Sequence, residues 1–262
     1  MSATVDTPVA RRPYAGGGLA GAIVAEWVKL RSVRSPYICL VAGVVVTAVF
    51  AFYYGSIARI NDAPRQPVGN APVTSLLVGQ FVFVVLAMIT VTSEYATSSV
   101  RTSLLGVPVR HRVLLAKAVV NAVVAFAGGV LFGVLGMAVA WAPFQGHATF
   151  AVSEAAVQLC AMGLYCALVA VLAVGVSFAL RASAGALTAL FVLVSAAPSA
   201  LTGLGGDVLL TLNDYLPQTA GMHMMHGGAD APYPAVVAAL IVVAWTAAAQ
   251  VAGLLMLQRR DA

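Results

Sequence analysis

Six long runs of apolar residues divide this chain into lengths that can cross a membrane as helices. About 20 helical residues cross a hydrocarbon core of ~30 Å. Runs such as VAGVVVTAVF are apolar on every face, as lipid-embedded helices are, and lack the alternating pattern of barrel strands. We therefore predict an all-α, polytopic membrane protein with six transmembrane helices. These helices are expected at residues 37–57, 74–92, 113–141, 155–180, 184–204 and 234–257.

The distribution of Lys and Arg predicts how these helices are oriented. Of the 14 Lys and Arg residues, Arg59 and Arg65 are the two that fall on one side of the six helices. Because cationic loops are retained in the cytoplasm, we predict a multi-pass protein of the cell (plasma) membrane with cytoplasmic N and C termini. This bias and the anionic lipid of the inner leaflet account for the net charge of +5, so nucleic-acid binding is not expected.

The segment before the first apolar run has two parts. Residues 1–18 are rich in Gly, Pro, Thr and Arg and are expected to form a disordered cytoplasmic N-terminus. Residues 19–34 are expected to form an amphipathic helix on the inner membrane surface, with Trp27 at the headgroups and Lys29 and Arg31 near anionic lipid. Four apolar residues recur at helical spacing on one face: Leu19, Ile23, Trp27 and Leu30. A plain extension of the first transmembrane helix is the alternative.

The connection between the second and third helices concentrates charge in a chain that is only 9% charged. Glu94 follows the second helix, and SSVRTSLLGV can form two helical turns with Leu104 and Leu105 on one side and Arg101 among them. A short helix that is partly apolar and partly charged suits docking to a protein partner. The alternative is that the retention of cationic loops in the cytoplasm explains these charges by itself.

The predicted helices hold few polar residues, and we find no Asp, Glu, Lys or Arg near the middle of any of them. This absence disfavours a carrier coupled to protons or ions, because such carriers commonly use buried carboxylates. Asn121, Gln158 and Gln250 could line a translocation path for a hydrophobic or amphipathic substrate. Hydrogen bonding between helices is the alternative role for each of them.

The connection between the fifth and sixth helices is long, but its apolar pieces are too short to span a membrane. VLLTL and AGMHMM suggest short helices that dip into the outer boundary. The run from Met222 to His226 brings thioether and imidazole groups together, which are ligands that copper or zinc accepts. Ordinary amphipathic packing also explains these residues, and we assign no metal site.

The segments EWVKLRS, EYATSSVRTSLLGVPVRHRVLLAK and the terminal LQRRDA, with the six helices, resemble the membrane permease subunits of ATP-binding-cassette (ABC) transporters of the type-2 exporter class. The resemblance implies a single transmembrane permease domain over residues 19–262. It also implies a connecting helix at 19–34, a coupling segment at 96–107 that contacts the ATPase, and a re-entrant external cap at 205–228. Glu94, Arg101, Leu104 and Leu105 would then serve partner docking.

The resemblance also implies which chemistry lies outside this chain. The sequence has no G-x-x-x-x-G-K-[ST] loop to cradle phosphates. ATP and Mg would be bound by a partner ATPase subunit, so this chain would be a transport subunit and not an enzyme. A second permease, identical or different, would complete the working unit. The alternatives are an ATP-independent carrier or channel and a membrane assembly protein that transports nothing.

Overall fold

The computed structural model describes residues 18–97, 99, 109–227 and 231–260, and these residues are almost wholly helical. Six helices are long and apolar enough to cross a membrane, which confirms the six predicted helices. Most of them begin or end a few residues beyond the apolar run, because polar end residues can continue a helix into the interface. The six are α2 (Ser35–Ile60), α3 (Asn70–Ala96), α5 (Arg110–Phe144), α6 (Val152–Leu180), an interrupted helix over Ser183–Leu204, and α11 (Ala235–Arg260).

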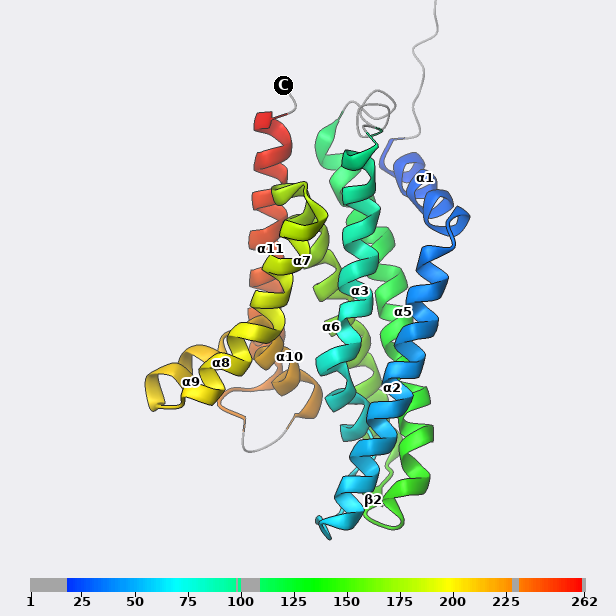
Figure 1. Ribbon diagram of the computed structural model, residues 1–262, viewed down its shortest axis with the longest axis vertical. Helices are drawn as coiled ribbons and strands as arrows, with labels where there is room; N and C mark the ends of the chain where they lie inside the picture. The colour runs from blue at the N-terminus through cyan, green and yellow to red at the C-terminus, as the bar shows by residue number, and fades with distance from the viewer. Residues whose placement is uncertain (1–17, 98, 100–108, 228–230, 261–262) are drawn as a thin grey trace, which may run out of the picture.

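The helices form an elongated bundle with two distinct ends (Figure 1). One end, which we call the terminal end, holds α1 (Gly18–Ser32), the close of α3, the start of α5 and the close of α11. The opposite, distal end holds the connection between α2 and α3 and the connection between α5 and α6. There β1 (Gln66–Pro67) in the first connection pairs in parallel with β2 (Ala148–Thr149) in the second.

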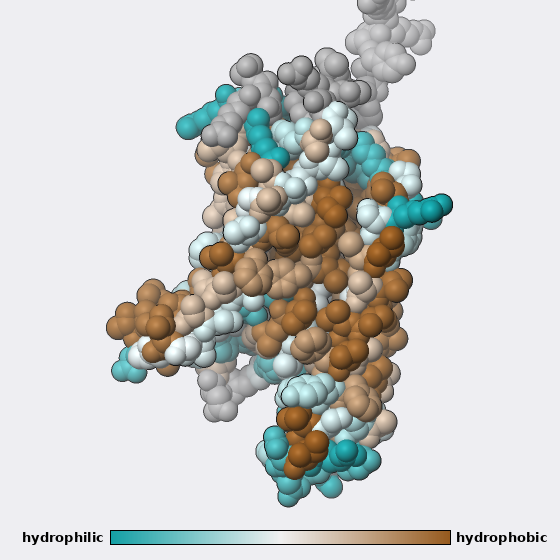
Figure 2. Space-filling view, viewed as in Figure 1, coloured by the Kyte–Doolittle hydropathy of each residue, from teal (hydrophilic) through white to brown (hydrophobic). Residues whose placement is uncertain are grey.

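The centre of the bundle is built by α3, α5 and α6, whose buried aromatic side chains include Phe83, Phe132 and Tyr165. In α3 and α6, 56% of the most apolar window is buried inside the chain, against 22% in α2 and 17% in α11. The outer helices therefore present most of their apolar side chains to lipid or to a partner. Figure 2 shows this broad apolar surface across the middle of the molecule, with hydrophilic side chains gathered mainly near its two ends.

Glycines set how closely the central helices approach one another. On α5, a Cβ atom at Gly129 would lie 2.9 Å from the Sγ atom of Cys166 and 3.0 Å from the carbonyl oxygen of Met162 on α6. On α6, a Cβ atom at Gly175 would lie 2.5 Å from the carbonyl carbon of Ala249 on α11. Backbone contacts this close are available only where one helix carries no side chain.

The fifth transmembrane helix runs without a gap over Ser183–Leu204, close to the predicted range, but it is not α-helical throughout. It consists of α7 (Ser183–Phe191), a π-helical turn (Val192–Ala196) and α8 (Ala197–Leu204). Pro198 cannot donate a backbone hydrogen bond to the carbonyl four residues before it, which belongs to Val194. The side-chain amide of Gln80 on α3 donates to that carbonyl instead, at 3.4 Å. The π-helical turn therefore lies just before Pro198 and is bonded across to α3 by Gln80.

The N-terminal region begins with α1, which turns sharply into α2 after two residues. The disorder predicted for residues 1–18 falls outside the described residues except for Gly18, which begins α1. Pro36 lies in the first turn of α2, where a missing N–H is tolerated. A helix therefore forms in the region expected to hold the connecting helix.

Candidate functional site

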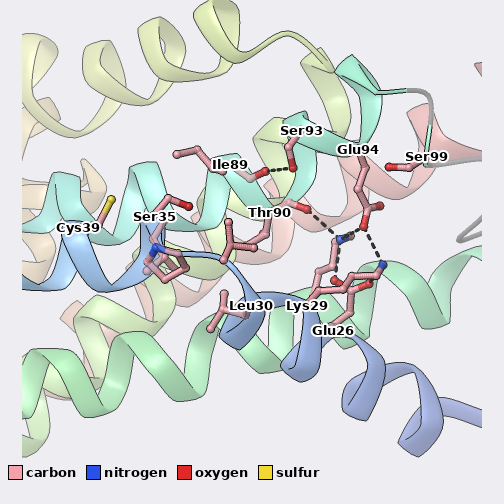
Figure 3. Close-up of a pocket in the computed structure, with 14 residues that line it drawn as sticks. Glu26, Lys29, Leu30, Ser35, Cys39, Ile89, Thr90, Ser93, Glu94 and Ser99 are labelled. Atoms are coloured by element: carbon pink, nitrogen blue, oxygen red, sulfur yellow. Dashed lines mark hydrogen bonds and ion pairs between the residues drawn. The ribbon is translucent and has the colours of Figure 1, made fainter.

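Four charged side chains from three helices meet at the terminal end, and we call them the charge cluster. Glu26 and Lys29 come from α1, Glu94 from the last turn of α3, and Lys117 from the third turn of α5. Figure 3 shows Glu26 and Lys29 reaching from α1 toward Glu94. Two carboxylates face two ammonium groups, so the formal charge of the cluster is zero.

Lys117 is the centre of the charge cluster, with a side chain that is only 1% exposed. Its Nζ atom donates to Oε2 of Glu26 at 2.7 Å, to Oε1 of Glu94 at 2.8 Å and to the carbonyl oxygen of Thr90 at 2.9 Å. An ammonium group has three donors, and all three are satisfied. A buried charge is tolerated only when it is paired and hydrogen-bonded in this way.

Lys29 closes the charge cluster on its open side, with 46% of its side chain exposed. Its Nζ atom lies 2.7 Å from Oε1 of Glu26 and 2.8 Å from Oε1 of Glu94. Burial by itself would lower the pKa of Lys29, but the hydrogen bonds and negative charges of the two carboxylates outweigh it, and the pKa is raised above its ordinary value of 10.5. Lys29 therefore stays charged at physiological pH.

The charge cluster flanks the segment that was expected to dock a partner. Glu94 lies just before that segment in the chain and Lys117 lies after it, so their ion pair holds the two flanks together. Arg101, Leu104 and Leu105 lie outside the described residues, and their docking role stays a prediction. Glu94 was grouped with them, but it is 8% exposed and its carboxylate is bonded inside the bundle.

The buried face of α1 differs from the apolar stripe that the sequence suggested. Ala22, Glu26 and Leu30 are its buried residues, and Leu30 packs beside Leu86 of α3. Trp27 is 37% exposed. The helix is thus rotated so that the carboxylate of Glu26 faces α5. Ala22 and Leu30 lie four positions before and after Glu26 on the same buried face. The apolar spacing of Leu19, Ile23, Trp27 and Leu30 gave no indication that Glu26 is buried.

The surface residues proposed for α1 lie beside the charge cluster. The guanidinium carbon of Arg31 lies 6.0 Å from the centre of the Trp27 ring, which is a favourable cation–π distance. Lys29 is bonded to Glu26 and Glu94, and its position near anionic lipid stays a prediction. The contact of Trp27 and Arg31 with the membrane surface stays a prediction.

Two arginines of the terminal end cap the last carbonyl groups of α11. Arg110 at the start of α5 donates to the carbonyl oxygens of Leu257 at 3.0 Å and Gln258 at 2.9 Å. Arg181, which follows α6, donates to the carbonyl oxygen of Met256 at 2.8 Å. Cations at a helix C-terminus interact favourably with the helix dipole and satisfy carbonyls that lack an intrahelical partner, here those of Leu257 and Gln258. The basic residues of this end thus also hold helices together.

The three residues proposed for a translocation path make hydrogen bonds between helices. Asn121 on α5 donates to the hydroxyl of Thr90 at 3.1 Å, and Gln158 on α6 donates to the side-chain oxygen of Asn70 at 3.2 Å. Gln250 on α11 donates to a backbone carbonyl oxygen of α6 at 2.5 Å. These bonds show the alternative role for all three side chains, and their part in a path stays a prediction.

The long connection after the fifth helix forms two short helices, α9 (Asp207–Asp214) and α10 (Pro217–His226). The Nε2 atom of His223 lies 3.4 Å from Oδ1 of Asp214. The Nδ1 atom of His226 lies 3.2 Å from the carbonyl oxygen of Met222 in the same helix. Among the described residues, no group of three or more His, Cys, Asp or Glu side chains could hold a metal ion. How deeply α9 and α10 enter the membrane stays a prediction.

Comparison with known proteins gives one family. A family model described as "ABC-2 family transporter protein" matches residues 22–197, which run from α1 to the first residue of α8 and include the whole charge cluster. The match covers more than half of the chain. No curated protein matches the chain.

Proposed function

Because the chain belongs to the ABC-2 transporter family and carries six membrane-spanning helices, we propose that this membrane subunit exports a hydrophobic or amphipathic substrate with energy from a separate ATPase subunit. The partner binds ATP and Mg, since this sequence has no phosphate-cradling loop. Two permease chains and two ATPase chains form the working unit. The terminal end of the bundle faces the cytoplasm, where the ATPase can reach segment 96–107.

The charge cluster is the observation that carries this proposal. It joins α1, α3 and α5 at the two flanks of segment 96–107, where a push from a partner would arrive. Breaking a buried ion pair costs about 3–5 kcal/mol, so the three helices move together and the flanks do not separate. Movement of the segment is passed to α3 and α5, which pack against α6 in the centre of the bundle.

Transport then follows from a shift between two arrangements of the bundle. An ATPase that binds segment 96–107 more tightly in one arrangement than in the other shifts the population toward the favoured one. The apolar surfaces of the fifth helix and of α11 are among the least buried parts of the bundle, and they leave room for a second permease chain. The substrate passes between the two permease chains.

The docking half of the proposal is tested by co-purification of the partner ATPase from detergent extracts. Arg101→Glu and Leu104→Asp should each lower the recovered ATPase about 30-fold, the effect of losing an interface residue worth ~2 kcal/mol. Arg112→Glu is the matched control, because it reverses an exposed arginine of the same end outside segment 96–107. Equal recovery from wild type and both variants would show that the ATPase docks elsewhere.

The transmission half is tested with the assembled complex. Leu204 is 76% exposed and lies far from segment 96–107. A spin label at this position in each permease chain reports the distance between the two chains. ATP should change this distance in wild type and leave it unchanged in Glu94→Gln, while ATPase recovery stays normal. The double reversal Glu94→Lys with Lys117→Glu should restore part of the change. A full ATP response in Glu94→Gln would refute transmission through the charge cluster.

A further inference from the structure

A cavity of about 390 Å3 lies beside the charge cluster, between α1, the start of α2 and the last turns of α3 (Figure 3). Its volume is within the range of small-molecule sites, ~300–1,000 Å3. The charge cluster forms its polar end. Its apolar wall is formed by Leu30, Val33, Cys39, Leu86 and Ile89. We propose that this cavity binds the headgroup region and one upper acyl chain of a neutral or zwitterionic membrane lipid.

The cavity is charged at one end and apolar farther along the bundle, in the same order as the headgroup and acyl chain of a lipid. On α3, Ile89 and Leu86 precede Glu94 by five and eight residues, which places them roughly 7 and 12 Å deeper at 1.5 Å per residue. On α2, Cys39 lies one turn inside the first residue, Ser35. The charged end therefore sits at the membrane boundary and the apolar wall extends toward the hydrocarbon.

The charges at the polar end select the headgroup. An anionic headgroup would approach the carboxylates of Glu26 and Glu94, and a cationic one would approach the ammonium groups of Lys29 and Lys117. Because the four charges sum to zero and bond one another, neither kind of net charge gains an uncompensated partner. A headgroup with no net charge, such as phosphoethanolamine or phosphocholine, meets both signs at once.

The position of the cavity favours a lipid over a molecule from solution. It adjoins α2, whose neighbouring side chains Ile38 and Val41 are 66% and 64% exposed. These apolar side chains face outward on a membrane-spanning helix and so contact lipid. A cavity next to such a face is filled from the bilayer without passage through water, and its size suits part of a lipid better than a whole two-chain molecule.

The cavity is tested with a zwitterionic lysophosphatidylcholine that carries a photoreactive diazirine on its acyl chain. In nanodiscs without a partner, irradiation followed by mass spectrometry should place the probe on peptides that contain Cys39 and Ile89. Unlabelled phosphatidylethanolamine should compete at least five-fold better than phosphatidylglycerol. Ile89→Trp should fill the wall and lower labelling about ten-fold, while Ile38→Trp, one residue from Cys39 on the exposed face, should leave it unchanged.

The three cysteines give a second measurement that does not depend on a variant folding. Occupancy by the lipid should slow alkylation of the half-buried Cys39 by N-ethylmaleimide, while the exposed Cys160 reacts at an unchanged rate and the buried Cys166 serves as the unreactive reference. Labelling spread evenly over all lipid-facing helices, or equal competition by phosphatidylglycerol, would overturn the proposal.

A final arm separates a resident lipid from a transported molecule. Because the binding measurements use the permease without an ATPase, they hold or fail independently of the proposed export. When the ATPase complex is supplied with ATP and Mg, a resident lipid keeps the same cross-linking yield. A yield that falls with ATP turnover would identify the occupant as cargo and overturn the assignment of a resident lipid.

Discussion

Lys117 illustrates how a charge is kept inside a membrane-spanning helix. Its neighbours supply two carboxylates and one carbonyl, so each of its three N–H groups has a partner. This arrangement stabilises the fold only while every charge in it is paired, because removing one member leaves its buried partners without a counter-ion. Lys29 differs, since almost half of its side chain is exposed and water can replace a lost partner.

Lys117→Met should lower the free energy of unfolding by about 3–5 kcal/mol, because Glu26 and Glu94 would keep buried charges without their central counter-ion. Thermal unfolding in detergent, followed by circular dichroism, measures this change. Lys117→Met combined with Glu26→Gln restores a neutral cluster and should recover much of the loss. The exposed Arg112→Met, the control, should change stability by less than ~0.5 kcal/mol. A loss below ~1 kcal/mol for Lys117→Met would contradict the buried pairing.

Lys29 should make the attachment of α1 sensitive to alkaline pH. Because its pKa is raised above 10.5, its contribution is complete below pH 10.5 and is lost as pH rises through the raised pKa. Fluorescence anisotropy of Trp27, in a protein with Trp141 and Trp245 replaced by Phe, should stay level from pH 7 to 10 and fall above 10.5. Lys29→Arg should move the fall to higher pH, because Arg stays charged beyond pH 12. An identical profile for this variant would refute the assignment.

At the scale of elements, the bundle combines close contacts between helices with a π-helical turn in the fifth helix. The contact between α6 and α11 depends on Gly175, where a Cβ atom would meet the backbone of the opposite helix. The fifth helix contains a π-helical turn, and the buried carbonyl of Val194 in this turn accepts a hydrogen bond from the side chain of Gln80. Gln80 also accepts a hydrogen bond from the Tyr165 hydroxyl. A small polar network therefore joins α3, α6 and the fifth helix at this point.

Gly175→Ala should destabilise the bundle by about 1–3 kcal/mol, the usual cost of overpacking. The added Cβ atom would lie 2.5 Å from the carbonyl carbon of Ala249 and 2.8 Å from the backbone nitrogen of Gln250, and neither can move unless α11 shifts. Gly203→Ala is the matched control, since a Cβ atom there meets nothing within 4 Å, and it should be neutral or slightly stabilising. Equal melting temperatures for the two variants would contradict this packing.

The elements that sequence reasoning predicted are those encoded locally. Length and apolarity decide a transmembrane helix, so all six were predicted. Pro198 was a local sign of the π-helical turn in the fifth helix, and the sequence analysis did not use it. The charge cluster was missed because Glu26 and Lys117 are 91 residues apart, and no local pattern pairs them. A carboxylate four residues from both Ala22 and Leu30, on the face that α1 buries, was the available signal.

At the scale of the whole molecule, the even number of spanning helices brings α1 and the close of α11 to the same end (Figure 1). This end also holds most of the Lys and Arg residues, among them Lys29, Arg110, Lys117 and Arg181. Which side of the membrane it faces decides whether a cytoplasmic ATPase can reach segment 96–107. The excess of cations predicts the cytoplasmic side.

Labelling of engineered cysteines in intact cells tests this orientation. Gly227→Cys, at an exposed position just after α10, should react with a membrane-impermeant maleimide added from outside. Ser99→Cys, near the charge cluster, should react only after the membrane is permeabilised. The unaltered protein with its three native cysteines gives the background. The reverse pattern would invert the topology and remove the cytoplasmic motor from the proposal.

The two arginine caps on α11 have a practical consequence. Because Arg110 and Arg181 bond the final turns of α11 to the beginning of α5 and to the residue after α6, any rearrangement of those helices moves the end of α11. A fluorophore fused just behind Arg260 would thus act as a remote gauge of the transport cycle, readable in living cells without placing a dye inside the bundle.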